Sequence, residues 1–181
     1  MYEAHLTVEA ETVERRQAFA AVCEALGVKC VLIELARGAH RSQPMTSSHH
    51  SGALADVQAE VAALQARLVD AGFTVLRVKI ESELTDEVAG LYFEFHAKVL
   101  AGEDVEALRA LCVANGAHLS NNAIERGVRF VTLRVYEASR DEACARFEHL
   151  LAVLGDYEIL GTKAEVTIHD SRVELDAGWL P

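Results

Sequence analysis

The stretches His5-Leu6-Thr7-Val8 and His96-Ala97-Lys98-Val99 decide the fold, because they open two segments of the same pattern. In each segment an apolar helical stretch follows, and its cysteine stands four residues before a glycine. These landmarks are Cys23 and Gly27 in the first segment and Cys112 and Gly116 in the second. Equal spacing in two segments indicates an internal duplication. We therefore predict an N-terminal lobe at residues 1–86 and a C-terminal lobe at residues 87–181, which share one core or groove.

The alternation of apolar and polar residues predicts the elements of both lobes. Strands are expected at 2–9, 28–36, 73–82, 91–100, 117–120, 129–137 and 157–170, and helices at 11–26, 53–71, 103–115 and 139–154. Each lobe then has the ferredoxin-like order βαββαβ, if residues 43–48 supply an irregular third strand in the first one. We predict an α+β protein of tandem duplicated ferredoxin-like units with antiparallel sheets, which meet face to face or edge to edge.

Charge and composition exclude several classes of partner. The 181 residues include 28 Asp or Glu and 17 Lys or Arg, a formal net charge of −11. This excess repels a polyanion, so we expect no extended nucleic acid as a partner. No stretch reaches the roughly 20 apolar residues of a membrane span, and no basic patch precedes an apolar run at the N-terminus. We expect a cytoplasmic protein with no membrane partner.

Residue parity sorts each predicted strand into two faces, because successive side chains point to opposite sides of a sheet. One face is apolar and is expected to pack against the helices: Leu6, Val8, Val78, Ile80, Phe93, Phe95, Val131 and Leu133. The other face is polar and is expected to line an open side of the sheet: His5, Thr7, Glu9, Arg77, Lys79, Glu81, Tyr92, Glu94, His96, Lys98, Thr132, Arg134 and Tyr136. A polar open face is the ordinary state of an antiparallel sheet, and that interpretation stays open.

The two strand histidines favour a site instead. His5 and His96 occupy equivalent positions in the two lobes, so a pseudo-twofold axis would bring them face to face across a groove. All four lysines of the chain fall in predicted strands or at their first residues. Basic groups in such a groove would hold an anion, most naturally phosphate: Arg77, Lys79, Lys98 and Arg134.

The segment His5-Leu6-Thr7-Val8 resembles the H-x-T-x motif of the two-histidine phosphoesterase superfamily, whose members have two pseudo-symmetric α/β lobes. This resemblance implies that His5 and His96 transfer protons and that Thr7 binds phosphate. Glu94 and Thr132, on the same polar face, are further candidate substrate-binding residues. The chemistry is reasonable near neutral pH, where one imidazole can accept a proton while the other donates one. It requires no metal. The second motif departs from the pattern, because Lys98 stands where a hydroxyl residue is expected.

Other resemblances compete with this one. Glu94-Phe95-His96-Ala97-Lys98 is similar to the E-x-E-x-K strand of triphosphate-tunnel proteins, with a histidine in place of the second glutamate. The lobes also resemble vicinal-oxygen-chelate modules, apart from the helices at 53–71 and 139–154. The run from Tyr92 to Lys98, with His118-Leu119-Ser120 and residues 129–134, further resembles an uncharacterised bacterial family, which implies no activity.

The polar segment 37–52 contains His40, His49 and His50. It is expected to be a solvated excursion or a partly strand-like loop, although three imidazoles on one segment could also converge on a transition metal. The sequence has no phosphate-binding G-x-x-x-x-G-K-S/T and no dinucleotide-binding G-x-G-x-x-G motif, so we predict no cofactor.

The sequence thus predicts a metal-independent phosphodiesterase or related phosphate-ester enzyme that acts on a small nucleotide or RNA end. The alternative is a binding module without catalysis for an anionic metabolite or an acidic partner segment. Either activity predicts a small anionic ligand, and a homodimer is left open.

Overall fold

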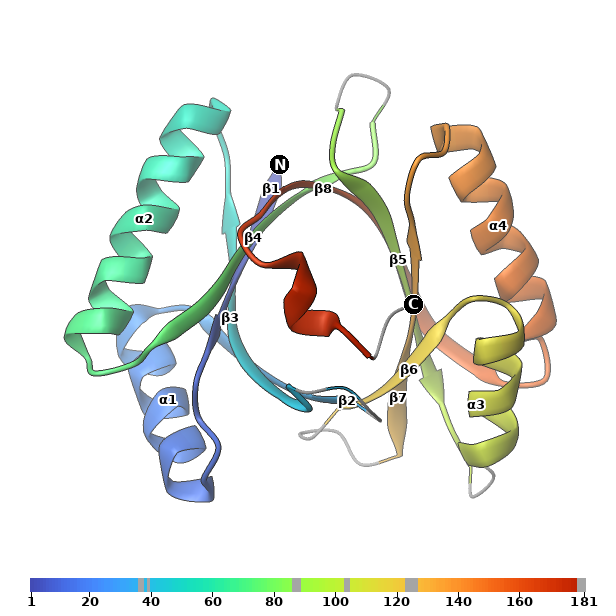
Figure 1. Cartoon of the computed structure of the whole chain (residues 1–181), viewed down its shortest axis with the longest axis horizontal. Coiled ribbons are helices and arrows are strands. Elements are labelled where there is room, and N and C mark those ends of the chain that lie inside the picture. Colours follow the sequence, from blue (N-terminus) through green and yellow to red (C-terminus); the bar gives the residue numbers. More distant parts are fainter. Residues whose placement is uncertain (36–37, 39, 86–88, 103–104, 123–126, 179–181) are drawn as a thin grey trace.

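The computed structural model describes residues 1–35, 38, 40–85, 89–102, 105–122 and 127–178. In this part of the chain eight antiparallel strands close into a barrel, and four α-helices lie outside it in two pairs on opposite flanks (Figure 1). The strands follow each other around the barrel in the order β1-β3-β2-β6-β7-β5-β8-β4.

The elements alternate in the same way in both lobes. The first lobe contains β1 (Tyr2–Val8), α1 (Val13–Leu26), β2 (Lys29–Leu35), β3 (Ser42–His50), α2 (Leu54–Asp70) and β4 (Val75–Glu83). The second contains β5 (Tyr92–Leu100), α3 (Val105–Ala114), β6 (His118–Asn122), β7 (Val128–Val135), α4 (Arg140–Val153) and β8 (Glu158–Asp170). A short 3-10 helix, η1 (Val173–Asp176), follows.

Strand order confirms the predicted fold class. Each lobe is βαββαβ, with the spatial order β4-β1-β3-β2 in the first and β8-β5-β7-β6 in the second, which is the ferredoxin-like arrangement. The lobes join edge to edge at two antiparallel seams, β2 with β6 and β4 with β8. Closure through both seams leaves no free sheet edge among the described strands. The predicted boundary between residues 86 and 87 falls outside the described residues.

The repeated cysteine–glycine spacing has a structural cause. Gly27 and Gly116 have φ angles of 69° and 68°, the left-handed conformation that commonly ends a helix. After each glycine the next backbone N–H donates back into the helix, from Val28 to the carbonyl of Cys23 and from Ala117 to that of Cys112. The two lobes therefore end their first helix with the same hydrogen-bonded turn.

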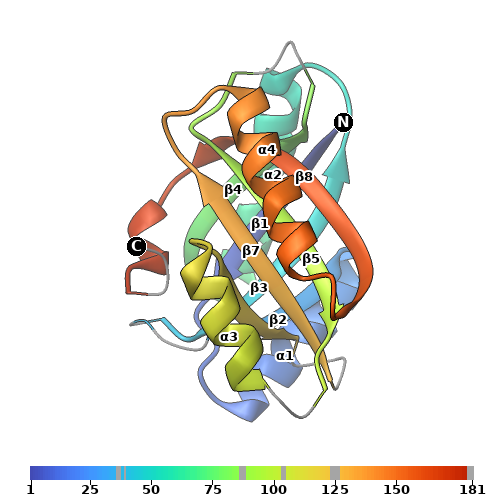
Figure 2. The ribbon, with the colours of Figure 1, turned by 90° about the vertical axis from the view of Figure 1, so that its right-hand side faces the viewer.

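Two apolar cores lie between the barrel and its helices rather than inside the barrel. In the first lobe Leu6, Val8 and Ile80 are buried with Phe19 of α1 and Leu68 of α2. In the second lobe the core contains Phe95, Val131, Leu133, Leu108 and Phe147, from two strands and both helices. Figure 2 shows α3 and α4 side by side over the strands of the second lobe. The apolar strand parity thus faces the helices, as expected.

The opposite parity corrects one expectation. The polar face was expected to be an open side of the sheet, yet the sheet closes on itself and this face points into the barrel. Lys79, Glu81, Glu94 and Thr132 are each less than 10% exposed as a result. Polar residues that alternation alone assigns to solvent are therefore interior residues.

The third strand expected at residues 43–48 is present. Residues 42–50 form β3, which pairs with β1 on one side and β2 on the other, so the interpretation of this segment as an excursion is wrong. His50 binds Glu60 of α2 at 2.7 Å, while His49 is 65% exposed at the same strand end. Within the described residues no group of His, Cys, Asp or Glu is arranged to hold a metal ion. No described helix has the length and apolarity needed to cross a membrane.

Candidate functional site

The barrel encloses a cavity of about 400 Å³, within the size range of small-molecule sites. Every strand contributes to its lining. All nine side chains that the sequence singled out line it: His5, Thr7, Arg77, Lys79, Glu94, His96, Lys98, Thr132 and Arg134. The four lysines of the chain, Lys29, Lys79, Lys98 and Lys163, do so as well. The predicted site residues therefore share one cavity.

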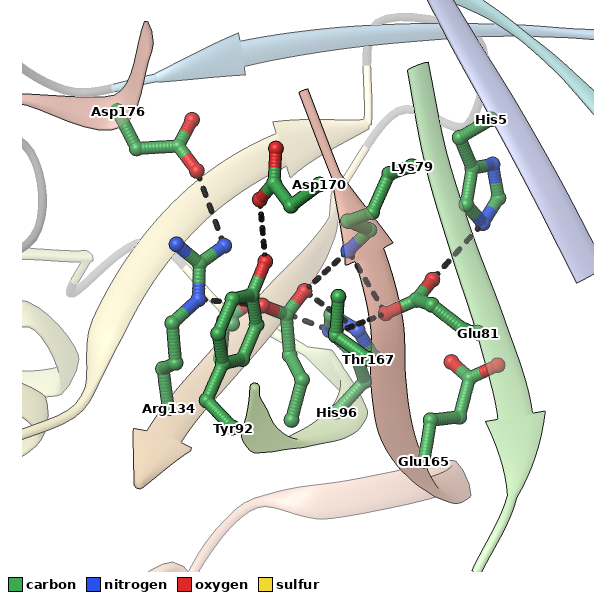
Figure 3. A network of polar contacts seen from close by, with 12 residues as sticks. His5, Lys79, Glu81, Tyr92, His96, Arg134, Glu165, Thr167, Asp170 and Asp176 are labelled. Carbon is green, nitrogen blue, oxygen red and sulfur yellow. Dashed lines mark hydrogen bonds and ion pairs between the residues drawn. The ribbon is translucent and has the colours of Figure 1, made fainter. Parts of the chain in front are cut away.

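A continuous ionic chain connects the two histidines (Figure 3). Lys79 Nζ lies 2.8 Å from Glu81 Oε1 and 2.8 Å from Glu94 Oε1. Glu81 Oε2 lies 3.2 Å from His5 Nε2, and Glu94 Oε1 lies 3.3 Å from His96 Nε2. Lys79 thus stands between two carboxylates, each of which faces one imidazole.

Because the groups of this ionic chain are buried, the pKa of each one depends strongly on the charge of its neighbours. Burial alone would raise the pKa of both glutamates, but Lys79 and the cations next to each carboxylate outweigh it and keep the pKa of Glu81 and Glu94 below the ordinary value. Burial likewise acts to lower the pKa of Lys79, and the charges of Glu81 and Glu94 raise it instead. The three groups are therefore ionised together near neutral pH.

The cavity repeats itself across the two lobes. His5 is paired with Lys79 of β4, and His96 with Lys163 of β8, at the same positions of the register. Two residues before each histidine is a glutamate, and two residues after each lysine is another. The first set is Glu3, His5, Lys79 and Glu81, and the second is Glu94, His96, Lys163 and Glu165.

The two sets also interlock. Lys79 of the first lobe binds Glu94 of the second, and Lys163 of the second lobe binds Glu3 of the first. Each lysine additionally contacts the glutamate of its own strand, at 2.8 Å for Glu81 and 2.7 Å for Glu165. The lobes therefore exchange ion pairs reciprocally inside the barrel.

Glu3, Lys163 and Glu165 were missed as site residues, and Glu81 was assigned only to the polar face. A signal for them exists in the sequence: E-x-H occurs at 3–5 and 94–96, and K-x-E at 79–81 and 163–165. The K-x-E motif lies on the last strand of each lobe, far in sequence from the histidines, so an alignment on the histidines alone does not reveal it.

The equivalent glutamates Glu81 and Glu165 differ in their electrostatics. Burial and the charge of Glu81 raise the pKa of Glu165, against the opposing effects of Lys163 and His96. The side chain of Lys79, beside Glu81, is 10% exposed, whereas that of Lys163 is 46% exposed, so solvent weakens the attraction between Lys163 and Glu165 more. Folding therefore lowers the pKa of Glu81 and raises the pKa of Glu165.

The hydrogen bonds of the histidines differ as well. His5 Nδ1 lies 3.2 Å from the carbonyl oxygen of Thr46, an acceptor, while its Nε2 faces carboxylates. The carbonyl and the carboxylates that face His5 are all hydrogen-bond acceptors. His96 Nδ1 instead lies 3.1 Å from the Thr132 hydroxyl, which can donate as well as accept, and its Nε2 faces Glu94.

The 3-10 helix η1 lies at one end of the barrel, within the ring of strands in Figure 1 and at the left side of the molecule in Figure 2. Asp176 of η1 is buried there and accepts hydrogen bonds from Arg77 at 2.8 Å, Arg134 at 2.9 Å and Gln43 at 2.9 Å. Arg77 also binds Asp170, and Arg134 binds Glu94 at 2.6 Å. The two arginines expected to hold an external anion are thus paired with carboxylates of the chain itself.

Comparison with known proteins identifies no family. No protein-family model matches the chain, and no curated protein matches it by sequence. Among solved structures, an acetolactate synthase small subunit from Thermotoga maritima is similar over 93% of this chain and 95% of its own, at 11% identity and a TM-score of 0.35. A mutant chlorite dismutase from Candidatus Nitrospira defluvii is similar over 97% and 92%, at 12% identity and a TM-score of 0.32. Likeness at this level carries no argument about function.

Proposed function

We propose that the barrel interior is the active site of a metal-independent phosphodiesterase or related phosphate-ester enzyme, which acts on a small nucleotide or RNA end. The observation that carries the proposal is that His5 and His96 line one cavity and that each has a carboxylate within 3.3 Å of its Nε2. A carboxylate beside an imidazole orients the ring and stabilises its protonated form, which suits proton transfer.

The hydrogen bonds suggest different roles for the two rings. His5 faces hydrogen-bond acceptors at both ring nitrogens and would act as the acid, which donates a proton to the leaving oxygen. His96, whose Nδ1 faces a hydroxyl that can donate, would act as the base and accept the proton of the attacking water after its bond with Thr132 rearranges. Thr7 and Lys98 line the cavity beside these rings and would contact the phosphate.

The proposal is tested with a panel of 2′,3′-cyclic nucleotides and generic phosphodiesters. His5→Ala and His96→Ala should each lower kcat by at least 100-fold while shifting Tm little, and the His169→Ala control, at an exposed position of β8 outside the cavity lining, should keep full activity. Full activity in both cavity variants would exclude this mechanism.

A second candidate is a binding module without catalysis for an anionic metabolite or an acidic segment. The pairing of Arg77, Lys79 and Arg134 with internal carboxylates favours it, because such pairs hold the barrel together without a substrate. Binding of cyclic nucleotides to the wild-type chain without any product would select this candidate.

The same proposal places the protein in the cytoplasm. All four cysteines are free thiols, as expected for a reducing compartment. A homodimer remains a prediction, which sedimentation of the purified chain would test.

A further inference from the structure

The cavity has two chemically different walls. Its five apolar lining side chains come from β2, β3 and β7: Val31, Ile33, Leu35, Met45 and Phe130. The histidines and all the glutamates of the lining come instead from β1, β4, β5 and β8. Since β3, β2, β6 and β7 are consecutive around the barrel, the seam between β2 and β6 lies in the apolar wall and the seam between β4 and β8 lies in the charged one.

Most side chains of the apolar wall remain partly exposed within the cavity. Val31, Ile33, Met45 and Phe130 are each only partly buried, although they point into the barrel. Val31 and Met45 are direct partners across β2 and β3, so their side chains form one continuous surface. Phe130 lies opposite Lys98 on β5, at the border between the walls. Accessible apolar surface inside a cavity gains free energy when an apolar group of a ligand covers it.

The charges of the cavity lining limit the net charge of the ligand that it can bind. Six basic and five acidic side chains line the cavity, an excess of one positive charge before the two histidines are counted. The acidic groups lie between the basic ones, so each additional negative charge on a ligand meets buried carboxylates as well as cations. The lining therefore complements one negative charge better than two or more.

Building on the proposed function, which supplies phosphate as the anionic group, we infer that the substrate is a monoanionic phosphodiester with an aromatic or aliphatic organic group. The organic group lies on the wall formed by Val31, Ile33, Met45 and Phe130, and the phosphate lies toward His5 and His96. A nucleobase satisfies the first requirement, whereas a polyphosphate chain fails the second.

Three small phosphates separate these requirements. Methyl phenyl phosphate is a monoanion with a ring, dimethyl phosphate is a monoanion without one, and phenyl phosphate at pH 8 is a dianion with a ring. Isothermal titration calorimetry on the wild-type chain should show methyl phenyl phosphate binding at least tenfold more tightly than either of the others. Ile33→Ser should reduce that affinity to the level of dimethyl phosphate and leave dimethyl phosphate unchanged.

Val31→Thr offers a second, milder change in the same wall should Ile33→Ser not fold, and Val113→Ser, at a 53% exposed position of α3, is the matched control. Equal affinity for the two monoanions, tightest binding of the dianion, or binding of none of the three would overturn the inference. The predicted order without any hydrolysis would leave this inference standing and remove the hydrolase proposal. Hydrolysis with no preference among the three phosphates would leave the hydrolase proposal standing and overturn this inference.

Discussion

Lys79 and Glu94 belong to different lobes, yet the Nζ of the lysine lies 2.8 Å from the carboxylate of the glutamate in the middle of the barrel. The pair is buried, and its counterpart between Lys163 and Glu3 lies nearer to solvent, with the lysine 46% exposed. The same lysine–glutamate ion pair thus occurs twice, once buried and once partly exposed. Substitutions at equivalent positions of the two lobes can therefore be compared.

Lys79→Met should be strongly destabilising. The substitution leaves Glu81 and Glu94 buried with the loss of a shared cation, and removal of one partner from a buried ion pair costs about 3–5 kcal/mol. Lys163→Met is the matched variant and should cost about 1 kcal/mol or less, because its ion pairs are partly exposed. Urea unfolding of both variants measures the difference, and equal losses would show that burial of the lysine does not determine the contribution of its ion pairs.

Acid should destabilise the protein through the glutamates of the barrel. Burial acts to raise the pKa of Glu3, but the charge of His5 and the hydrogen bonds from Lys163 and Ser47 lower it to about 2. A carboxyl group whose pKa is lowered by folding contributes stability above its unfolded pKa of 4.5, and this contribution is lost as the pH falls toward about 2.

Glu3→Gln should therefore lower the free energy of unfolding by about 1–2 kcal/mol at pH 7 and by much less at pH 2.5. Urea midpoints of the wild type and the variant across this range test the expectation. A loss that is independent of pH would show that packing, rather than ionisation, accounts for the effect.

Glu165→Gln should have the opposite dependence on pH. Folding raises the pKa of Glu165 through burial and the nearby charge of Glu81, so the ionised group disfavours the folded state once the pH exceeds the unfolded value of 4.5. The variant should be more stable than the wild type by about 1 kcal/mol at pH 8, with the advantage disappearing in acid.

Glu81→Gln, at the equivalent position of the first lobe, is the natural comparison for this prediction. It should be destabilising at pH 8, because the folded structure keeps the pKa of Glu81 low. Stability curves of the two variants that run parallel with pH would disprove the electrostatic asymmetry between the lobes.

Asp176→Ala should loosen the end of the barrel that η1 occupies. Two arginines and Gln43 lose a shared acceptor, and a buried charge without its partner costs about 3 kcal/mol. Amide hydrogen exchange should become faster in residues 173–178, and the melting temperature should fall. Glu174→Ala, at a position 72% exposed in the same helix, should change neither quantity.

The sequence by itself determined the duplication, the element order and the two faces of each strand. These are local properties: periodicity sets strand parity, and a glycine that ends a helix in the left-handed conformation leaves the same mark in both lobes. The same parity selected nine residues that line one cavity, because side chains alternate along a strand regardless of which strands it pairs with.

Only the tertiary structure decided that the polar face is the inside of a barrel. Closure depends on which strand edges meet, and the seams between β2 and β6 and between β4 and β8 join residues far apart in the chain. The seams also determine that Lys79 meets Glu94, that Arg77 and Arg134 meet Asp176, and that an apolar wall faces the charged one. Pairing of charges across such distances depends on three-dimensional proximity, for which a single sequence contains no local signal.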